Sequence, residues 1–171
     1  MVLNIINQLK FTRREFKKGF SGIEGKDGYQ RLLPMNSVGW IVGHLAWHEQ
    51  SYWLTRAQGK ILVPEIIDQV GFKKPASTPS LNEMIGFWEE ITKASDAYLE
   101  KLSVNGLMSC MVVEGKELPF NIGTMISRVI YHYWYHNGEI QAIRQLQGNK
   151  NLPDFVSDDI ETVGSFFLDK Q

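Results

Sequence analysis

Cysteine is almost absent from this sequence of 171 residues, and long apolar runs are absent altogether. Cys110 stands alone, so no disulfide can form within the chain. No stretch approaches the roughly 20 consecutive apolar residues that a membrane-spanning helix needs. Residues 1–9 are interrupted by Asn4 and Asn7, where a signal peptide would need an apolar run. We therefore expect a cytoplasmic protein with no membrane partner.

The sequence also lacks an excess of charge of either sign. The 18 Lys and Arg residues oppose 19 Asp and Glu residues, which gives a formal net charge of -1. Such a chain has no bulk electrostatic attraction to nucleic acid, so no nucleic-acid partner is expected. A basic group does share one face of the first predicted helix, where a solvated surface is favoured over a phosphate site. Its members are Lys10, Arg13, Arg14, Lys17 and Lys18.

The motifs of several enzyme classes are missing too. There is no phosphate-binding loop of the Walker type and no dinucleotide fingerprint after a strand. The segment His44-Leu-Ala-Trp-His-Glu49 places its glutamate after the second histidine, whereas zinc proteases carry His-Glu-x-x-His. Neither a nucleotide-dependent enzyme nor a peptidase is indicated.

What the sequence does contain is four long segments with the apolar periodicity of helices. The length fits one domain over residues 1–171 with one core. We predict an all-α four-helix bundle. Ser80 and Glu83 match the capping box that opens a helix, and Gly148 ends the last segment. The expected helices span residues 2–20, 36 or 37 to 59, 80–102, and 121 or 124 to 148.

The connections between these helices differ in length. Residues 60–79 carry three prolines and no sustained period, which predicts a long crossover over the surface. Residues 111–118 read as a small hairpin-like excursion. The tail, 152–171, is too apolar to stay in solvent and is expected to dock as a short helix on the bundle or on a partner chain.

All four histidines fall into two pairs at helical spacing, His44 with His48 and His132 with His136. Residues four apart lie on one face of a helix, so each pair can aim two imidazoles at one point. Both pairs interrupt apolar, inward-facing stripes, where buried ring nitrogens need partners. A metal shared between two helices would supply such a partner. The alternative is structural, because an isolated histidine in a core is more often hydrogen-bonded to the protein than bound to a metal.

Two glutamates lie near the histidine pairs. Glu139 is a candidate ligand, a carboxylate behind a ligand, or a solvated side chain near the helix end. Glu49 is rotated by about 140° from His44 on an ideal helix, so a surface or interface salt bridge is its favoured role.

The chain resembles the DinB-like superfamily of damage-inducible proteins in two motifs. These are residues 37–49, Ser-Val-Gly-Trp-Ile-Val-Gly-His-Leu-Ala-Trp-His-Glu, and residues 132–140, His-Tyr-Trp-Tyr-His-Asn-Gly-Glu-Ile. The resemblance implies an up-up-down-down helix order and a divalent metal held by His44, His132 and His136. It leaves His48 as a fourth ligand, a catalytic acid or base, or a residue lining the pocket. It also implies a homodimer.

Three imidazoles leave a coordination position open, as in catalytic metal sites. Relatives that resemble this chain include thiol-dependent transferases and isomerases. We therefore expect a metal-dependent thiol S-transferase or hydrolase, with a low-molecular-weight thiol or water attacking a small electrophile and His48 moving a proton. Zinc is the favoured metal, and nickel and iron are the alternatives. The competing hypothesis is a metal-binding or stress-response interaction protein without turnover.

Overall fold

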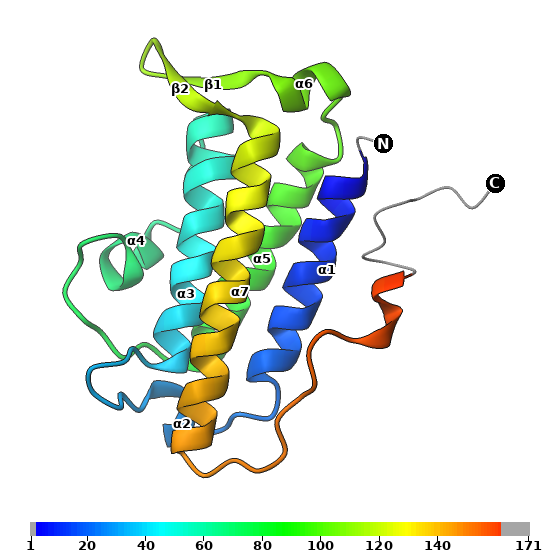
Figure 1. Cartoon of the computed structure of the whole chain (residues 1–171). Helices are drawn as coiled ribbons and strands as arrows, with labels where there is room; N and C mark the ends of the chain where they lie inside the picture. The colour runs from blue at the N-terminus through cyan, green and yellow to red at the C-terminus, as the bar shows by residue number, and fades with distance from the viewer. Residues whose placement is uncertain (1–2, 162–171) are drawn as a thin grey trace.

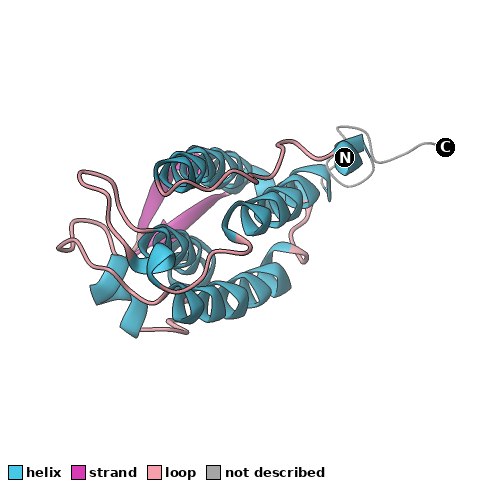
Figure 2. Ribbon diagram, turned by 90° about the horizontal axis from the view of Figure 1, so that it is seen from below, coloured by secondary structure: helices cyan, strands magenta, loops and turns pink. Residues whose placement is uncertain are grey.

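Four long helical segments lie side by side in the computed structural model of this chain, which describes residues 3–161 (Figure 1, Figure 2). The structure is mostly helical and adds a small two-stranded antiparallel sheet. The predicted helices are thus confirmed, with ends within a few residues of those expected. They are α1 (Leu3–Phe20), α3 (Val38–Glu49) continued by the π-helix η1 (Gln50–Arg56), α5 (Leu81–Leu99) and α7 (Ile122–Leu146).

The helices begin at polar residues that the sequence had marked. Ser37 caps α3 and Asn121 caps α7, and each side chain accepts a hydrogen bond from the backbone N–H three residues further on. Ser80 is the N-cap of α5, but its side chain makes no capping hydrogen bond. The capping box expected between Ser80 and Glu83 is therefore wrong, while the start of the helix is right.

The directions of the helices can be read from the ion pairs that join them. Lys10 pairs with Glu100, and Lys17 pairs with Glu89 at 2.6 Å, so α1 and α5 are antiparallel. Figure 1 shows α7 running with α1, and α3 running with α5. The order along the chain is up-down-down-up rather than the up-up-down-down order that the resemblance implied. The long crossover at 60–79 explains the difference, because it joins the parallel pair α3 and α5.

Helix α3 packs closely on α5 through glycines. A Cβ atom at Gly43 would collide with the Met84 side chain, and one at Gly39 would collide with the carbonyl oxygen of Pro79. Close approach of this kind requires glycine. The contact fixes the helix that carries the first histidine pair.

The connecting segments add short helices and the hairpin. The hairpin is confirmed, because β1 (Cys110–Val113) pairs antiparallel with β2 (Lys116–Asn121) around a turn at Glu114 and Gly115, both with positive φ. The crossover is not entirely irregular, since it contains a helix. The short helices are α2 (Lys26–Tyr29), α4 (Glu65–Val70), α6 (Val104–Met108) and the 3-10 turn η2 (Asp158–Glu161).

The first part of the C-terminal tail contacts the helices. Ser157 donates its backbone N–H to the Glu15 carboxylate at 3.0 Å. The Phe155 ring lies edge-on to Trp134, with 6.2 Å between ring centroids. Docking of the tail is thus confirmed as far as Ser157, through a segment that is not helical, and residues 162–171 lie outside the described residues.

Buried apolar side chains from all four long helices form one contiguous cluster. Its fully enclosed members include Leu9, Phe16, Ile41, Leu45, Trp53, Met84, Ile91, Ile126 and Ile140. Within residues 3–161, no helix is both long enough and apolar enough to cross a bilayer.

Candidate metal centre

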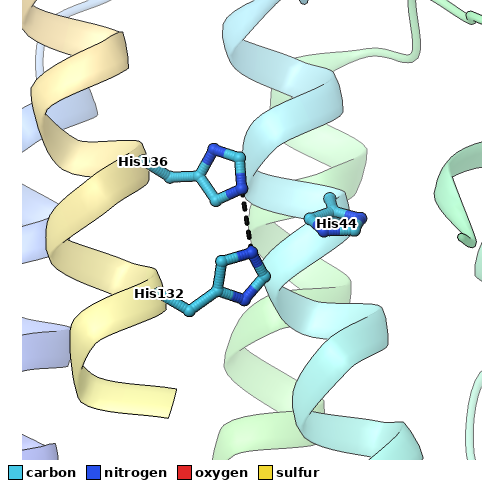
Figure 3. A group of neighbouring side chains, drawn as sticks. All are labelled: His44, His132 and His136. Atoms are coloured by element: carbon cyan, nitrogen blue, oxygen red, sulfur yellow. Dashed lines mark hydrogen bonds between the residues drawn. The ribbon is translucent and has the colours of Figure 1, made fainter. Parts of the chain in front are cut away.

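Three histidines from two facing helices converge at the middle of the structure. His44 comes from α3, and His132 and His136 come from α7 (Figure 3). One ring nitrogen from each lies within 4.8 Å of the others. The Nε2 atoms of His132 and His136 are 3.0 Å apart. The convergence expected from the helical spacing of the histidine pairs is therefore present for these three residues.

The outer ring nitrogens of two of these histidines have acceptors. Nδ1 of His44 lies 3.0 Å from the backbone oxygen of Val70, and Nδ1 of His136 lies 2.8 Å from a carboxylate oxygen of Glu139. A carbonyl or carboxylate oxygen only accepts, so both Nδ1 atoms carry the proton. The lone pair of each neutral ring is then on Nε2. Of the alternatives for Glu139, the structure places it behind His136.

The carbonyl oxygen that orients His44 belongs to the crossover, and a buried amide holds the start of this crossover in place. The Gln50 side chain accepts hydrogen bonds from the N–H groups of Leu62 and Val63 at 2.9 and 2.7 Å. It also donates to the oxygen of Val63 at 2.9 Å. Because Gln50 follows α3 directly, the helix and the segment leading to Val70 are tied together beside the site.

Burial keeps the imidazoles of His44 and His132 neutral. Desolvation, followed by the neighbouring charge of His136, lowers the pKa of His132 to about 3. Desolvation also lowers the pKa of His44, although the hydrogen bond to Val70 opposes the shift. Neutral imidazole is the form that binds a metal, so both rings are in the ligating form at neutral pH.

His48 lies beside the three-histidine group rather than within it. Its ring centroid is 4.4 Å from that of His132 and 4.6 Å from that of Tyr52. Burial, and then the charge of His132, lowers the pKa of His48 to about 2. Its Nδ1 is buried and has no hydrogen-bond partner among the described residues, and the same holds for Nδ1 of His132.

Aromatic rings surround the histidines. Trp40 stacks on His44 at 4.6 Å with an interplanar angle of 9°, and Trp47 lies 5.5 Å away on the same ring. Tyr135 meets His136 edge-on at 5.2 Å. These contacts restrict the orientation of the imidazoles and reduce the access of water.

A second buried polar cluster, which the sequence reasoning missed, includes the residues that follow His48 and His132 on the same two helices. Glu49 is fully buried and receives two hydrogen bonds from Arg13, at 2.7 and 2.5 Å. Tyr133 donates its hydroxyl to Glu49 at 2.8 Å, and Trp88 donates its indole N–H to Tyr133 at 2.7 Å. A further contact of 2.5 Å joins Arg13 to Asp96. We refer to these five residues as the Glu49 network.

The network corrects two expectations. Glu49 was expected in a surface or interface salt bridge, and Arg13 on a solvated basic face, but both are buried. Desolvation opposes the charge on Arg13, yet Glu49 raises the pKa of this guanidinium above its usual value. The overlooked signal is that Glu49 is the only Asp, Glu, Lys or Arg residue between Val38 and Glu49. A helix without a polar face is buried on all sides, so its charge needs a buried partner.

The three-histidine group fits a divalent cation. Two nitrogens bound to zinc at its usual distance and a tetrahedral angle are separated by about 3.3 Å, close to the 3.0 Å between His132 and His136. Nδ1 of His44 is held by a carbonyl oxygen and Nδ1 of His136 by a carboxylate. Hydrogen bonds of this kind orient imidazole ligands towards a metal.

Comparison with known proteins identifies the family of the chain. No curated protein matches the chain. The sequence profile of the DinB superfamily matches residues 8–140, a stretch that runs from α1 into α7 and includes both histidine pairs. Because this match covers most of the sequence, the chain belongs to the DinB superfamily.

Proposed function

We propose that this protein is a metal-dependent enzyme built on a four-helix bundle, with a divalent cation held by His44, His132 and His136. The observation that carries the proposal is the convergence of three ring nitrogens within 4.8 Å. The hydrogen bonds of His44 and His136 support it, because they direct two Nε2 lone pairs towards one point.

The composition of the group supports catalysis rather than a sealed structural site. Among the described residues, it contains three histidines and no Cys, Asp or Glu as a fourth donor. Structural zinc sites have four protein ligands, and catalytic ones keep a position open. A bound zinc ion lowers the pKa of a coordinated water or thiol. We propose transfer of a low-molecular-weight thiol to a small electrophile, or hydrolysis of that electrophile, with nickel and iron as alternative metals.

His48 is proposed as the residue that receives a hydrogen bond from the attacking group. Its ring lies next to His132, and its buried Nδ1 has no partner among the described residues. A pKa of about 2 keeps this imidazole unprotonated at neutral pH, so it can accept a hydrogen bond but does not store a proton.

Turnover by reloaded protein tests the proposal. Untagged protein is freed of metal, reloaded with zinc, nickel or iron(II), and assayed on small electrophiles with a panel of thiols and with water alone. We expect activity that depends on metal and is lost in His132→Ala, with a smaller loss in His48→Gln. Metal binding by the histidines without turnover would contradict the proposed enzymatic activity and would favour a non-catalytic metal-binding protein.

A further inference from the structure

A pocket of about 410 Å³ lies where η1, the hairpin and the start of α7 meet. This volume is within the range of about 300–1,000 Å³ that is typical of small-molecule sites. Figure 1 shows that the hairpin covers this end of the long helices. The residues that line the pocket include Tyr52, Arg56, Leu118, Phe120, Arg128 and Tyr131.

Two arginines give the pocket an unbalanced positive charge. Within residues 3–161, neither Arg56 nor Arg128 forms an ion pair with a carboxylate. The Arg56 guanidinium lies over the Tyr52 ring, 4.7 Å from its centroid. A stacked guanidinium keeps its in-plane N–H groups free, and these match the two oxygens of a carboxylate or phosphate.

The rest of the pocket is mainly apolar. Leu118 and Phe120 of β2 and Met125 of α7 contribute aliphatic and aromatic surface, and Phe120 remains 48% exposed. An apolar wall beside two unpaired cations complements a ligand that has an apolar body and one anionic end.

The pocket adjoins the histidines through shared residues. Tyr52 lines the pocket and contacts the ring of His48 at 4.6 Å between centroids, and His48 contacts His132 at 4.4 Å. Arg128 precedes His132 by one helical turn on α7. The pocket is therefore connected to the candidate metal centre through the rings of Tyr52 and His48.

We infer that this pocket binds a small amphipathic organic anion, whose carboxylate or phosphate contacts Arg56 and Arg128 and whose apolar part packs on Leu118 and Phe120. The inference deepens the proposed function by naming a substrate class. It rests on that function only in calling the bound molecule a substrate, since the binding itself needs no metal.

Calorimetric titration of four probes tests the inference. Octanoate and octyl phosphate carry the two candidate oxyanions, while octanamide and octanol are uncharged counterparts of similar size. We expect the anions to bind at least about tenfold more tightly than their counterparts, because hydrogen bonds to charged groups are the stronger ones. The tighter of the two anions identifies the oxyanion. Arg56→Gln and Arg128→Gln should each weaken the preferred anion by about tenfold or more.

Arg31→Gln is the matched control. Arg31 donates to the backbone of Met35 near α2, away from the residues that line the pocket, so the substitution should leave anion affinity unchanged. Equal binding of anions and uncharged counterparts, or equal binding by wild type and both pocket variants, would overturn the inference. Zinc titration of the same proteins separates the two proposals. Anion binding without zinc binding would contradict the metal centre alone. Zinc binding without anion selectivity would contradict the anion pocket alone.

Discussion

Adjacent residues on two helices build polar clusters of opposite character. His48 and Glu49 follow one another on α3, as do His132 and Tyr133 on α7. The Glu49 network is charged, and each of its buried groups has a partner. In the histidine cluster, burial lowers the pKa of His132 to about 3 and that of His48 to about 2, and the Nδ1 atoms of both rings have no partner among the described residues. A buried network in which every polar group is paired stabilises a structure, whereas the approach of ring nitrogens from His44, His132 and His136 to within 4.8 Å of one another indicates a site for a metal.

The Glu49 network also holds the helices that carry the histidines in position. Arg13 on α1 contacts Glu49 on α3, Tyr133 on α7 donates to the same carboxylate, and Asp96 on α5 contacts Arg13. One network therefore links all four long helices next to the histidines. Because Glu49 is adjacent to His48, this link fixes the register of α3 against α7 and hence the separation of the ligands.

The largest effect is expected from breaking the network. Glu49→Ala leaves the Arg13 guanidinium buried without its main partner, which should lower the free energy of unfolding by about 3–5 kcal/mol. Urea denaturation of metal-free protein measures the change. Glu89→Ala, which removes an exposed pair with Lys17, should cost less than about 1 kcal/mol. Similar losses in both variants would show that burial gives Glu49 no special role.

The next effect concerns the ligands. His132→Ala should weaken zinc binding at least about a hundredfold, since even residues behind a ligand contribute about 10- to 100-fold. His48→Ala should have a smaller effect, because His48 is outside the group of three. Competition calorimetry with a chelator measures both affinities. Equal losses would contradict the assignment of His44, His132 and His136 as the ligands.

A smaller effect on zinc affinity is expected from Glu139, which contacts a ligand and not the metal. Glu139→Gln removes the charge that accepts the Nδ1–H of His136, and should weaken zinc binding by about 10- to 100-fold. Glu90→Gln on the exposed face of α5 is the matched control and should leave the affinity unchanged. An unaltered affinity in Glu139→Gln would place this carboxylate among the solvated residues.

The smallest effect concerns pH. The folded chain holds His48 with a pKa of about 2, whereas an unfolded imidazole titrates near about 6.5. Between these values the unfolded chain binds the additional proton, so stability falls as the pH falls. From roughly pH 6.5 to 5.5, metal-free wild type should lose roughly 1 kcal/mol more than His48→Gln. Parallel pH profiles of the two proteins would contradict a buried, neutral His48.

Local chemistry made the helices and the histidine convergence predictable from the sequence. Ser37 and Asn121 are strong helix caps, and the spacing of His132 and His136 fixes a shared face. These features depend on neighbours within a few residues, and periodicity captures such neighbours. The same reasoning found the hairpin, because its turn requires Gly115 at positive φ.

The Glu49 network and the helix order depend on contacts between residues far apart in the sequence, and periodicity does not reveal such contacts. The partner of Glu49 is 36 residues earlier in the chain, on a helix whose other basic residues are half-buried or exposed. Nothing in the sequence sets the direction of α3 relative to α1, so neither this pairing nor the helix order followed from it. The π-helix after Glu49 has no sequence signal, although it positions Gln50 and hence the crossover.

An anomalous-scattering crystal structure of zinc-soaked, untagged protein would locate the metal and identify its ligands. The proposed ligand set predicts one zinc peak per chain, within bonding distance of His44, His132 and His136, with a coordination position open to a non-protein ligand. A fully ordered histidine cluster without zinc, or zinc bound at other residues, would contradict it.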